Sequence, residues 1–218
     1  RSLDGYGLGP RGDRANVTTG ALGHMSQKVS LSELKDQELE ERVIHIDRVK
    51  KTVKGGDLIS FRALVAVGNK EGVVGVATGK ARATPDAIAK GFDKAKKNLW
   101  RVPLDGVTIP HQIQRRVGGA IVLMKPASRG TGVIAGGAVR AVVELAGILD
   151  ILSKCLGSNT AVNNAAAAFE CLKGLVDAQR VAELRGRTVE EILGEAEPSL
   201  DDDAYGETVG VGSDEDED

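Results

Sequence analysis

The sequence predicts an α+β protein with two folded domains, and three observations support this class. Strand-like segments separated by glycine turns occupy residues 42–78, and an amphipathic helix pattern follows them. After residue 105, strand and helix patterns alternate. Charge also divides the chain: residues 42–129 hold 18 Lys+Arg and 6 Asp+Glu, a net +12, whereas residues 195–218 hold 11 Asp+Glu and neither Lys nor Arg. A basic folded part of this kind indicates a polyanionic partner, usually a nucleic acid.

The composition restricts the possible functions. Hydrophobic residues make up 41% of the 218 residues and aromatic residues only 3%, so we expect an aliphatic core. Cys155 and Cys171 have neither metal-binding spacing nor a disulfide framework, and we interpret both as buried free thiols. The histidines lie far apart, so neither a catalytic cluster nor a cofactor is predicted. No apolar run approaches the roughly 20 residues that span a bilayer, and no membrane partner is expected.

We expect both ends of the chain to lack a fold of their own. Residues 1–27 are rich in glycine and polar residues without a period, which is typical of a disordered arm. Residues 195–218 are too acidic and too poor in apolar residues to form a core, so a disordered tail is predicted. The chain does not begin with Met, which we interpret as a removed transit peptide or a truncation.

The first domain, residues 28–104, begins with a predicted helix over residues 31–41, where Ser30 and Glu33 form a capping box. A meander follows, with strands over residues 42–53, 57–68 and 73–78. A second helix is predicted over residues 85–100. The resulting order, αβββα, is that of a double-stranded-RNA-binding domain, a fold that follows phosphates and shape rather than sequence.

Basic residues gather around the first hairpin turn. The turn contains Gly55 and Gly56, of which at least one is expected to adopt a positive φ. Lysines on a strand edge can simply deter edge pairing. Few acidic residues lie nearby, however, so we favour phosphate contact for the four cations near the turn, Arg48, Lys50, Lys51 and Lys54.

The helix over residues 85–100 carries a second basic set. At about 100° per residue, Lys94, Lys97 and Arg101 fall within roughly 40° of Lys90, and apolar residues gather on the opposite side. A solvated lysine face is the ordinary alternative. Such faces usually mix both signs of charge, so we favour a phosphate-facing role for this stripe.

The second domain, residues 105–194, is predicted to have the order ββαβα. Its strands are expected over residues 107–113, 117–125 and 148–153. Arg115 and Arg116 would then lie at the turn between the first two strands. Helices are expected over residues 137–147 and 163–176. Thr188 and Glu191 form a capping box before a last short helix.

The glycine-rich loop of residues 126–136 admits three interpretations. Gly130-Thr-Gly132-Val-Ile-Ala135 fits a loose dinucleotide-binding pattern, with Asp150 in the position of the ribose ligand. The loop could instead only pack a helix against a sheet. The third interpretation is a macromolecular contact made by the backbone and Arg129, and the basic charge of the chain favours it.

Several segments of the chain have sequences that are typical of one protein family. They are Val49-Lys-Lys-Thr-Val-Lys-Gly-Gly56, Val74-Gly-Val-Ala-Thr-Gly-Lys-Ala81, Pro126-Ala-Ser128 and Gly130-Thr-Gly-Val-Ile-Ala-Gly-Gly-Ala-Val-Arg140. They resemble ribosomal small-subunit protein five of the bacterial and organellar branch, and the match is dense over about residues 38–193. The resemblance implies a structural, non-enzymatic role near the decoding site and the mRNA entrance. It also implies small-subunit rRNA and small-subunit proteins four and eight as partners.

The candidate site residues combine the basic sets with this resemblance. The predicted rRNA-binding residues are Arg48, Lys50, Lys51, Lys54, Gly55, Gly56, Lys80, Arg82, Lys90, Lys94, Lys97, Arg101, Arg115, Arg116 and Arg129. The resemblance places Gly132 and Arg140 where family variants alter translational accuracy, at the contact with protein four. Arg140 also precedes Glu144 by four residues, so the two side chains can pair within a helix.

The resemblance also bears on the compartment. Segments such as Ser60-Phe-Arg-Ala63 and Ile109-Pro-His111 are similar to the sequences of plastid or cyanobacterial members of the family. We therefore favour a chloroplast ribosome over the bacterial cytoplasm. Two other functional hypotheses remain. The αβββα order alone suggests a free-standing duplex-RNA-binding protein, which would leave the second domain without a role. The glycine-rich loop alone suggests a nucleotide-using enzyme.

Overall fold

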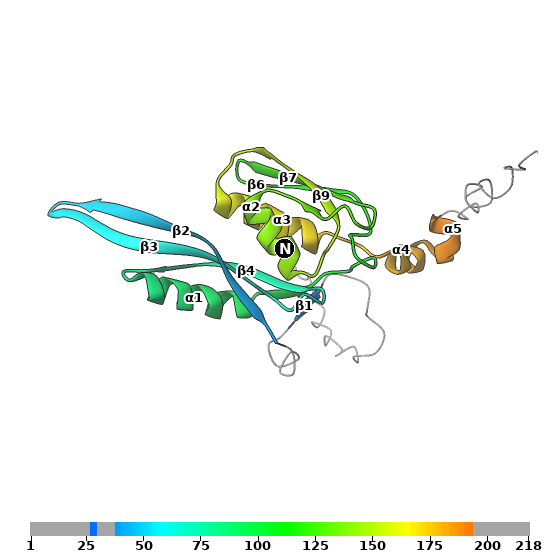
Figure 1. Ribbon diagram of the computed structural model, residues 1–218, viewed down its shortest axis with the longest axis horizontal. Coiled ribbons are helices and arrows are strands. Elements are labelled where there is room, and N and C mark those ends of the chain that lie inside the picture. Colours follow the sequence, from blue (N-terminus) through cyan, green and yellow to red (C-terminus); the bar gives the residue numbers. More distant parts are fainter. Residues whose placement is uncertain (1–26, 30–37, 194–218) are drawn as a thin grey trace, which may run out of the picture.

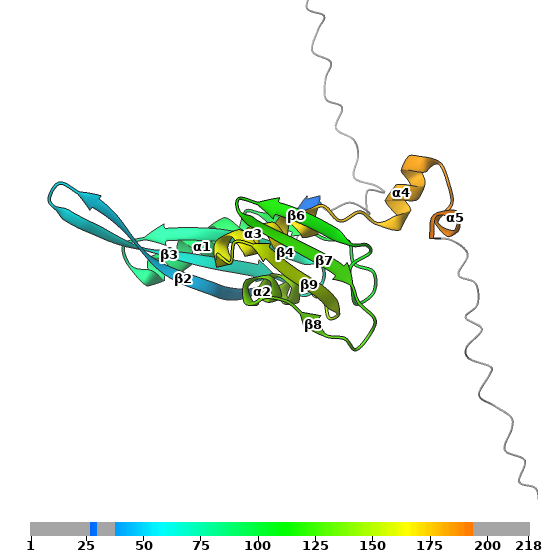
Figure 2. The ribbon, with the colours of Figure 1, turned by 90° about the horizontal axis from the view of Figure 1, so that it is seen from above.

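The computed structural model of the protein describes residues 27–29 and 38–193. Its first sheet has five antiparallel strands in the spatial order β1-β5-β4-β3-β2. These strands are β1 (Gln27–Val29), β2 (Glu40–Val53), β3 (Gly56–Gly68), β4 (Val73–Ala81) and β5 (Leu99–Arg101). The predicted meander is confirmed as β2, β3 and β4, and the ends of β2 and β3 project from the molecule as a long hairpin (Figures 1 and 2).

Helix α1 (Thr84–Lys96) covers one face of the first sheet (Figure 1). Pro85 lies in its first turn, as predicted, because proline needs no hydrogen-bond acceptor there. Ala87 and Ala95 are fully buried in a cluster with apolar residues of β3 and β4. A Cβ on Gly79 would lie 2.0 Å from the carbonyl oxygen of Ala87, so only glycine lets the helix approach β4 this closely.

The second sheet lies on the opposite side of the first sheet from α1. Its strand order is β6-β7-β9-β8, and its strands are β6 (Ile113–Val117), β7 (Ala120–Pro126), β8 (Val133–Ile134) and β9 (Ile151–Gly157). Helices α2 (Gly137–Leu145) and α3 (Ala161–Lys173) lie between the two sheets (Figure 1). Two short helices, α4 (Ala178–Arg185) and α5 (Val189–Leu193), follow. The layers are therefore α1, the first sheet, α2 with α3, and the second sheet.

The two halves of the molecule share one hydrophobic core. Leu64 of β3 and Val76 of β4 belong to the same buried cluster as Met124 of β7, Val142 of α2 and Leu172 of α3. Leu64 and Val76 lie on the face of the first sheet opposite to α1, because side chains alternate along a strand. This face would expose a broad apolar surface without the second half.

Backbone groups also join the halves. The N–H of Lys70 donates to the carbonyl of Leu145 at 3.0 Å, and the N–H of Gly72 donates to the carbonyl of Ala146 at 2.9 Å. A Cβ on Gly68 would lie 2.2 Å from the carbonyl oxygen of Leu145. The turn after β3 is therefore fixed directly against the end of α2.

Two predicted elements of the first half are wrong in part. The helix predicted over residues 31–41 is wrong at its end, because Glu40 and Glu41 begin strand β2, where they bind Lys70 and Lys96 respectively. Residues 38 and 39 are not helical either. Four predicted features lie outside the described residues: residues 31–37 of that helix, its capping box, residues 1–26 of the predicted arm, and the acidic tail. The helix predicted over residues 85–100 ends at Lys96. The segment after it pairs as β5 between β4 and β1, and β1 itself was not predicted.

The second half also differs from its predicted order. Residues 107–112 form no strand, since Pro110 lacks the N–H that a strand ladder needs. The first strand instead begins at Ile113, and its turn falls at Gly118 and Gly119. The strand predicted over residues 148–153 runs from 151 to 157. The predicted helices are confirmed as α2 and α3, whereas β8 and α4 were not foreseen because β8 is too short and α4 too polar to show a period.

Candidate nucleic-acid interface

The hairpin of β2 and β3 presents its cations on two opposite faces. Lys51 lies on one face, whereas Arg48 and Lys50 lie on the other, because neighbouring side chains alternate. The Lys50 ammonium is 3.0 Å from the Asp57 carboxylate. Hydrogen bonds from Thr52 and Lys50 lower the pKa of Asp57. Lys50 therefore already has an anionic partner within the hairpin.

A hollow lies on the face of the hairpin that carries Lys51. Its cations are Lys51 of β2, Lys80 of β4 and Arg82 just after β4, and its floor includes Val49 and Leu58. Asp57, which pairs with Lys50, is the one acidic residue of its lining. Leu58 is 53% exposed. Cations around an exposed apolar floor suit a nucleic-acid strand, whose phosphates need positive charge and whose sugars and bases offer apolar surface. The sequence analysis proposed all three cations but had no means of showing that they share one hollow.

The turn of the hairpin has the backbone that was predicted for it. Lys54 and Gly55 form the turn itself, and both are exposed. Gly56 has a φ of +133°, so the expectation of a positive φ at one of the two glycines is confirmed. A Cβ on Gly55 would meet no atom within 4 Å, so the tip of the hairpin is open on that side.

The basic stripe on α1 is shorter than predicted. Lys90, Lys94 and Lys97 are exposed, and they lie on the side of α1 away from the sheet, because the buried residues of the helix are Ala87, Gly91 and Ala95. Arg101 is not part of this surface, because it lies in β5, opposite Val73 of β4. The helical period was extended too far along the chain, since α1 ends before Arg101.

Arg115 and Arg116 do not form one cluster. Both lie within β6, so they point to opposite faces of the second sheet. Arg115 reaches the end of α3, where its Nη2 would be 3.0 Å from a Cβ on Gly174. Arg116 stays on the outer face, where its Nε donates to the carbonyl of Gly118 at 3.0 Å. Of these two arginines, only Arg116 therefore lies on the outer face of the second sheet.

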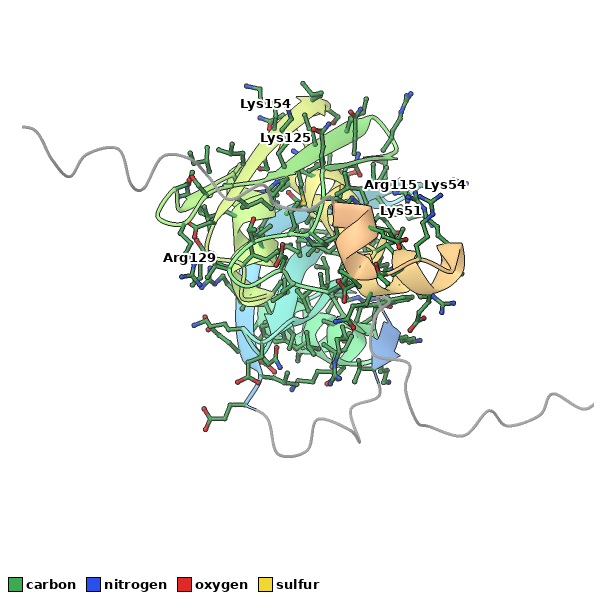
Figure 3. All side chains as sticks on the ribbon, turned by 90° about the vertical axis from the view of Figure 1, so that its right-hand side faces the viewer. Lys51, Lys54, Arg115, Lys125, Arg129 and Lys154 are labelled. Atoms are coloured by element: carbon green, nitrogen blue, oxygen red, sulfur yellow. The ribbon has the colours of Figure 1, made fainter. Side chains whose placement is uncertain are left out.

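The outer face of the second sheet carries two cations that the sequence analysis missed. Lys125 of β7 and Lys154 of β9 extend outward from it, and Figure 3 shows both at the edge of the molecule. Exposed apolar residues lie beside them, including Leu152, Leu156 and Ile134. The sequence carried little signal for them, because each lysine is a single cation in a mainly apolar segment, AIVLMKP in β7 and ILSKCLG in β9.

Asp150 holds the glycine-rich loop in place. Its side chain is 5% exposed, and its carboxylate accepts the N–H of Gly132 at 2.7 Å. Gly132 has a φ of +74°, which favours glycine, and its carbonyl accepts the N–H of Ile151 at 3.2 Å. The Asp150 carboxylate is therefore already hydrogen-bonded to the backbone of the loop. This geometry disfavours the dinucleotide interpretation, in which Asp150 would bind a ribose.

Arg140 and Glu144 do not pair as predicted. Arg140 turns back along α2 and donates to the carbonyl of Val133 at 3.1 Å, next to Gly132. Glu144 instead forms an ion pair with Arg42 of β2, and this hydrogen bond raises the pKa of Arg42. The two candidate accuracy residues, Gly132 and Arg140, thus lie at the same loop. Arg129 lies at the exposed beginning of that loop and points away from the molecule (Figure 3).

The two cysteines have different environments. Cys171 is fully buried, its thiol donates to the carbonyl of Val122 at 3.4 Å, and burial raises its pKa to about 11. Cys155 is half-buried, so the predicted burial is confirmed only for Cys171. Among the described residues, no group of three His, Cys, Asp or Glu side chains is placed to hold a metal ion. No helix in this part of the chain has the length and apolar character needed to cross a membrane.

Two family models match this chain. The model described as ribosomal protein S5, N-terminal domain, matches residues 39–103, which include the hairpin and α1. The model described as ribosomal protein S5, C-terminal domain, matches residues 115–185, which include the glycine-rich loop, α2 and α3. Together the two matches cover more than half of the 218 residues.

Proposed function

The chain belongs to the ribosomal protein S5 family of structural, non-enzymatic proteins of the small ribosomal subunit, which bind rRNA and other ribosomal proteins, and from this membership we propose how it holds rRNA. The main contact is the hollow on the hairpin, and it lies near the decoding site and the path of the entering mRNA. The observation that carries this proposal is the placement of Lys51, Lys80 and Arg82 around the exposed Leu58 on a projecting hairpin.

Two further surfaces extend this contact. Lys90, Lys94 and Lys97 on α1 bind phosphates as the corresponding helix of a double-stranded-RNA-binding domain would. The order β2-β3-β4-α1, shared with that domain, supports this mode. Arg116 and Arg129 supply contacts from the second half. Lys50 contributes less, because its ammonium is already paired with Asp57.

The test is a salt titration of binding to a fragment of small-subunit rRNA. The logarithm of the binding constant falls linearly with the logarithm of the salt concentration, and each lost phosphate contact should make this slope shallower by about 0.7–0.9. Lys51→Gln and Lys80→Gln should each lower both the affinity and the slope. Lys28→Gln is the matched control, because it makes the same change at an exposed lysine of β1, at the opposite edge of the first sheet from β2. Equal effects of Lys28→Gln and Lys51→Gln would show that the hollow is not the contact.

The loop around Gly132 is proposed as the contact with small-subunit protein four, and protein eight is a second proposed neighbour. The side chain of Arg140 already lies against this loop, so one substitution there alters an exposed surface without entering the core. Arg140→Leu should weaken the contact between this loop and protein four. A weaker contact favours the closed conformation of the small subunit during tRNA selection, so stop-codon readthrough in a reporter should rise. Arg185→Leu, at an exposed arginine of α4, is the control. Normal readthrough in an assembled Arg140→Leu subunit would exclude this role.

The compartment is proposed to be the chloroplast stroma, where the protein would be part of the plastid ribosome. This proposal is supported by segments such as Ile109-Pro-His111, whose sequences resemble those of plastid members of the family. Fractionation of plant cells followed by sedimentation provides the test. The protein should sediment with small subunits from isolated plastids, and its recovery only in the cytosolic ribosome fraction would contradict the assignment.

A further inference from the structure

A small cavity lies where the N-termini of α2 and α3 converge. Its lining includes Gly136, Gly137, Cys155, Asn159, Ala161 and Asn164. Neither helix has a side-chain hydrogen bond at its N-cap within the described residues. The first backbone hydrogen bonds of the two helices begin at Arg140 and Asn164, so the N–H groups of both first turns lack helical acceptors.

Asn164 is a second, independent sign that the cavity takes a ligand. Its side chain is only 4% exposed, and its amide oxygen has no hydrogen-bond partner among the described residues. Burying an amide without a partner is unfavourable. An amide can exchange its oxygen and NH2 by a flip, so Asn164 can also offer donors to the cavity.

The charge of the cavity defines the ligand. Each helix N-terminus carries roughly half a positive charge, and here two of them meet. Neither Asp nor Glu lines the cavity. Cys155 is the only ionisable side chain in the lining, and burial raises its pKa, so its thiol stays neutral near neutral pH. Converging N–H donors without a competing carboxylate are the chemistry of an anion site.

We propose that this cavity binds a phosphate group of an RNA backbone. The choice of RNA rests on the proposed function, since the chain belongs to an rRNA-binding family. The site thus adds to the RNA contact of the second half without using a basic side chain of its own.

The first measurement follows backbone amide signals of the full chain by NMR during a titration with inorganic phosphate. The signals of Gly137 and Ala161 should shift as phosphate is added. Asn164→Asp should lower the phosphate affinity about tenfold or more, because it places a carboxylate against the anion. Asn163→Asp is the matched control, because it makes the same change one residue away at a side chain that lies beside Gly118 instead.

A second variant tests the same site in case Asn164→Asp does not fold. Gly137→Ala adds a methyl group to the cavity wall, where a Cβ meets no atom within 4 Å and the φ is not positive. The fold should therefore tolerate the change, while access of phosphate to the helix N-terminus should fall.

The second measurement identifies the source of the phosphate by alkylation of Cys155. Bound rRNA fragment should slow the reaction of Cys155 with N-ethylmaleimide several-fold in the wild type and not in Asn164→Asp. Phosphate shifts without protection by bound RNA would assign the cavity to free phosphate or to a partner's carboxylate, and would overturn the RNA assignment while leaving the hairpin contact intact. Absence of both effects would leave a water-filled cavity and overturn the proposal. A failure of the wild type to bind rRNA at all would overturn the proposed function as well.

Discussion

At the scale of single residues, ion pairs depend on which strands and helices meet. Glu144 was expected to bind Arg140 four residues away, but it binds Arg42 from β2. Both side chains of this pair are more than one third exposed, so its contribution to stability is small, about 0–1 kcal/mol. Its main consequence is that it occupies Glu144 and frees Arg140 to lie against the glycine-rich loop.

Asp47 gives a prediction about acid stability. A hydrogen bond from Arg62 lowers the pKa of Asp47, with Nη2 of Arg62 2.7 Å from the carboxylate. The folded pKa is below the unfolded value of about 3.9, so the stabilisation is present above that value and is lost as the pH falls through the folded pKa. Unfolding by urea should therefore show a steeper loss of stability below about pH 4 in the wild type than in Asp47→Asn. Parallel pH profiles would show that the pair contributes nothing.

At the scale of elements, glycines decide how α1 meets the first sheet. Gly79 brings β4 against the backbone of α1, and a Cβ there would collide with backbone atoms of Ala87 and Gly91. Gly79→Ala should lower the free energy of unfolding by about 1–3 kcal/mol, because a backbone collision cannot be relieved by a side-chain rotation. Urea unfolding followed by circular dichroism measures this change.

Gly55→Ala is the control for this prediction. It lies in the hairpin turn, where an added Cβ meets no atom within 4 Å and the φ is not positive. Its free energy of unfolding should change by less than about 0.5 kcal/mol. If Gly79→Ala were equally harmless, the close contact between α1 and β4 would not be essential for the fold.

At the scale of the whole molecule, the shared core should make the two halves unfold together. Leu64 lies on the first sheet but is buried with residues of α2, α3 and the second sheet. Leu64→Ala should lower the free energy of unfolding by about 2–5 kcal/mol and should reduce hydrogen-exchange protection in both sheets. Leu184→Ala, at a side chain of α4 that is 68% exposed, is the control. A loss of protection confined to the first sheet would mean that the halves are separately stable.

Local patterns in the sequence were sufficient for the longest elements. Apolar residues with a period near 3.6 predicted α1, α2 and α3, and glycine turns between apolar segments predicted β2, β3 and β4. The positions of charged residues, in turn, gave Lys51, Lys80 and Arg82 as candidate cations and showed the opposite charges of the folded part and the tail. Each of these features depends on residues close together in the chain, and so the sequence by itself determined them.

The tertiary structure alone decided which faces meet. Whether residues 99–101 continue a helix or form an inner strand depends on β1 and β4, which pair with them on either side, because Leu99 is buried in either case. Whether Asp150 binds a ribose or holds a loop depends on where Gly132 comes to lie. The cavity beside Asn164 exists because the N-termini of α2 and α3 come together where the two helices pack between the two sheets. Burial and hydrogen bonding between distant segments determine these arrangements, and a local period carries no information about its distant partner.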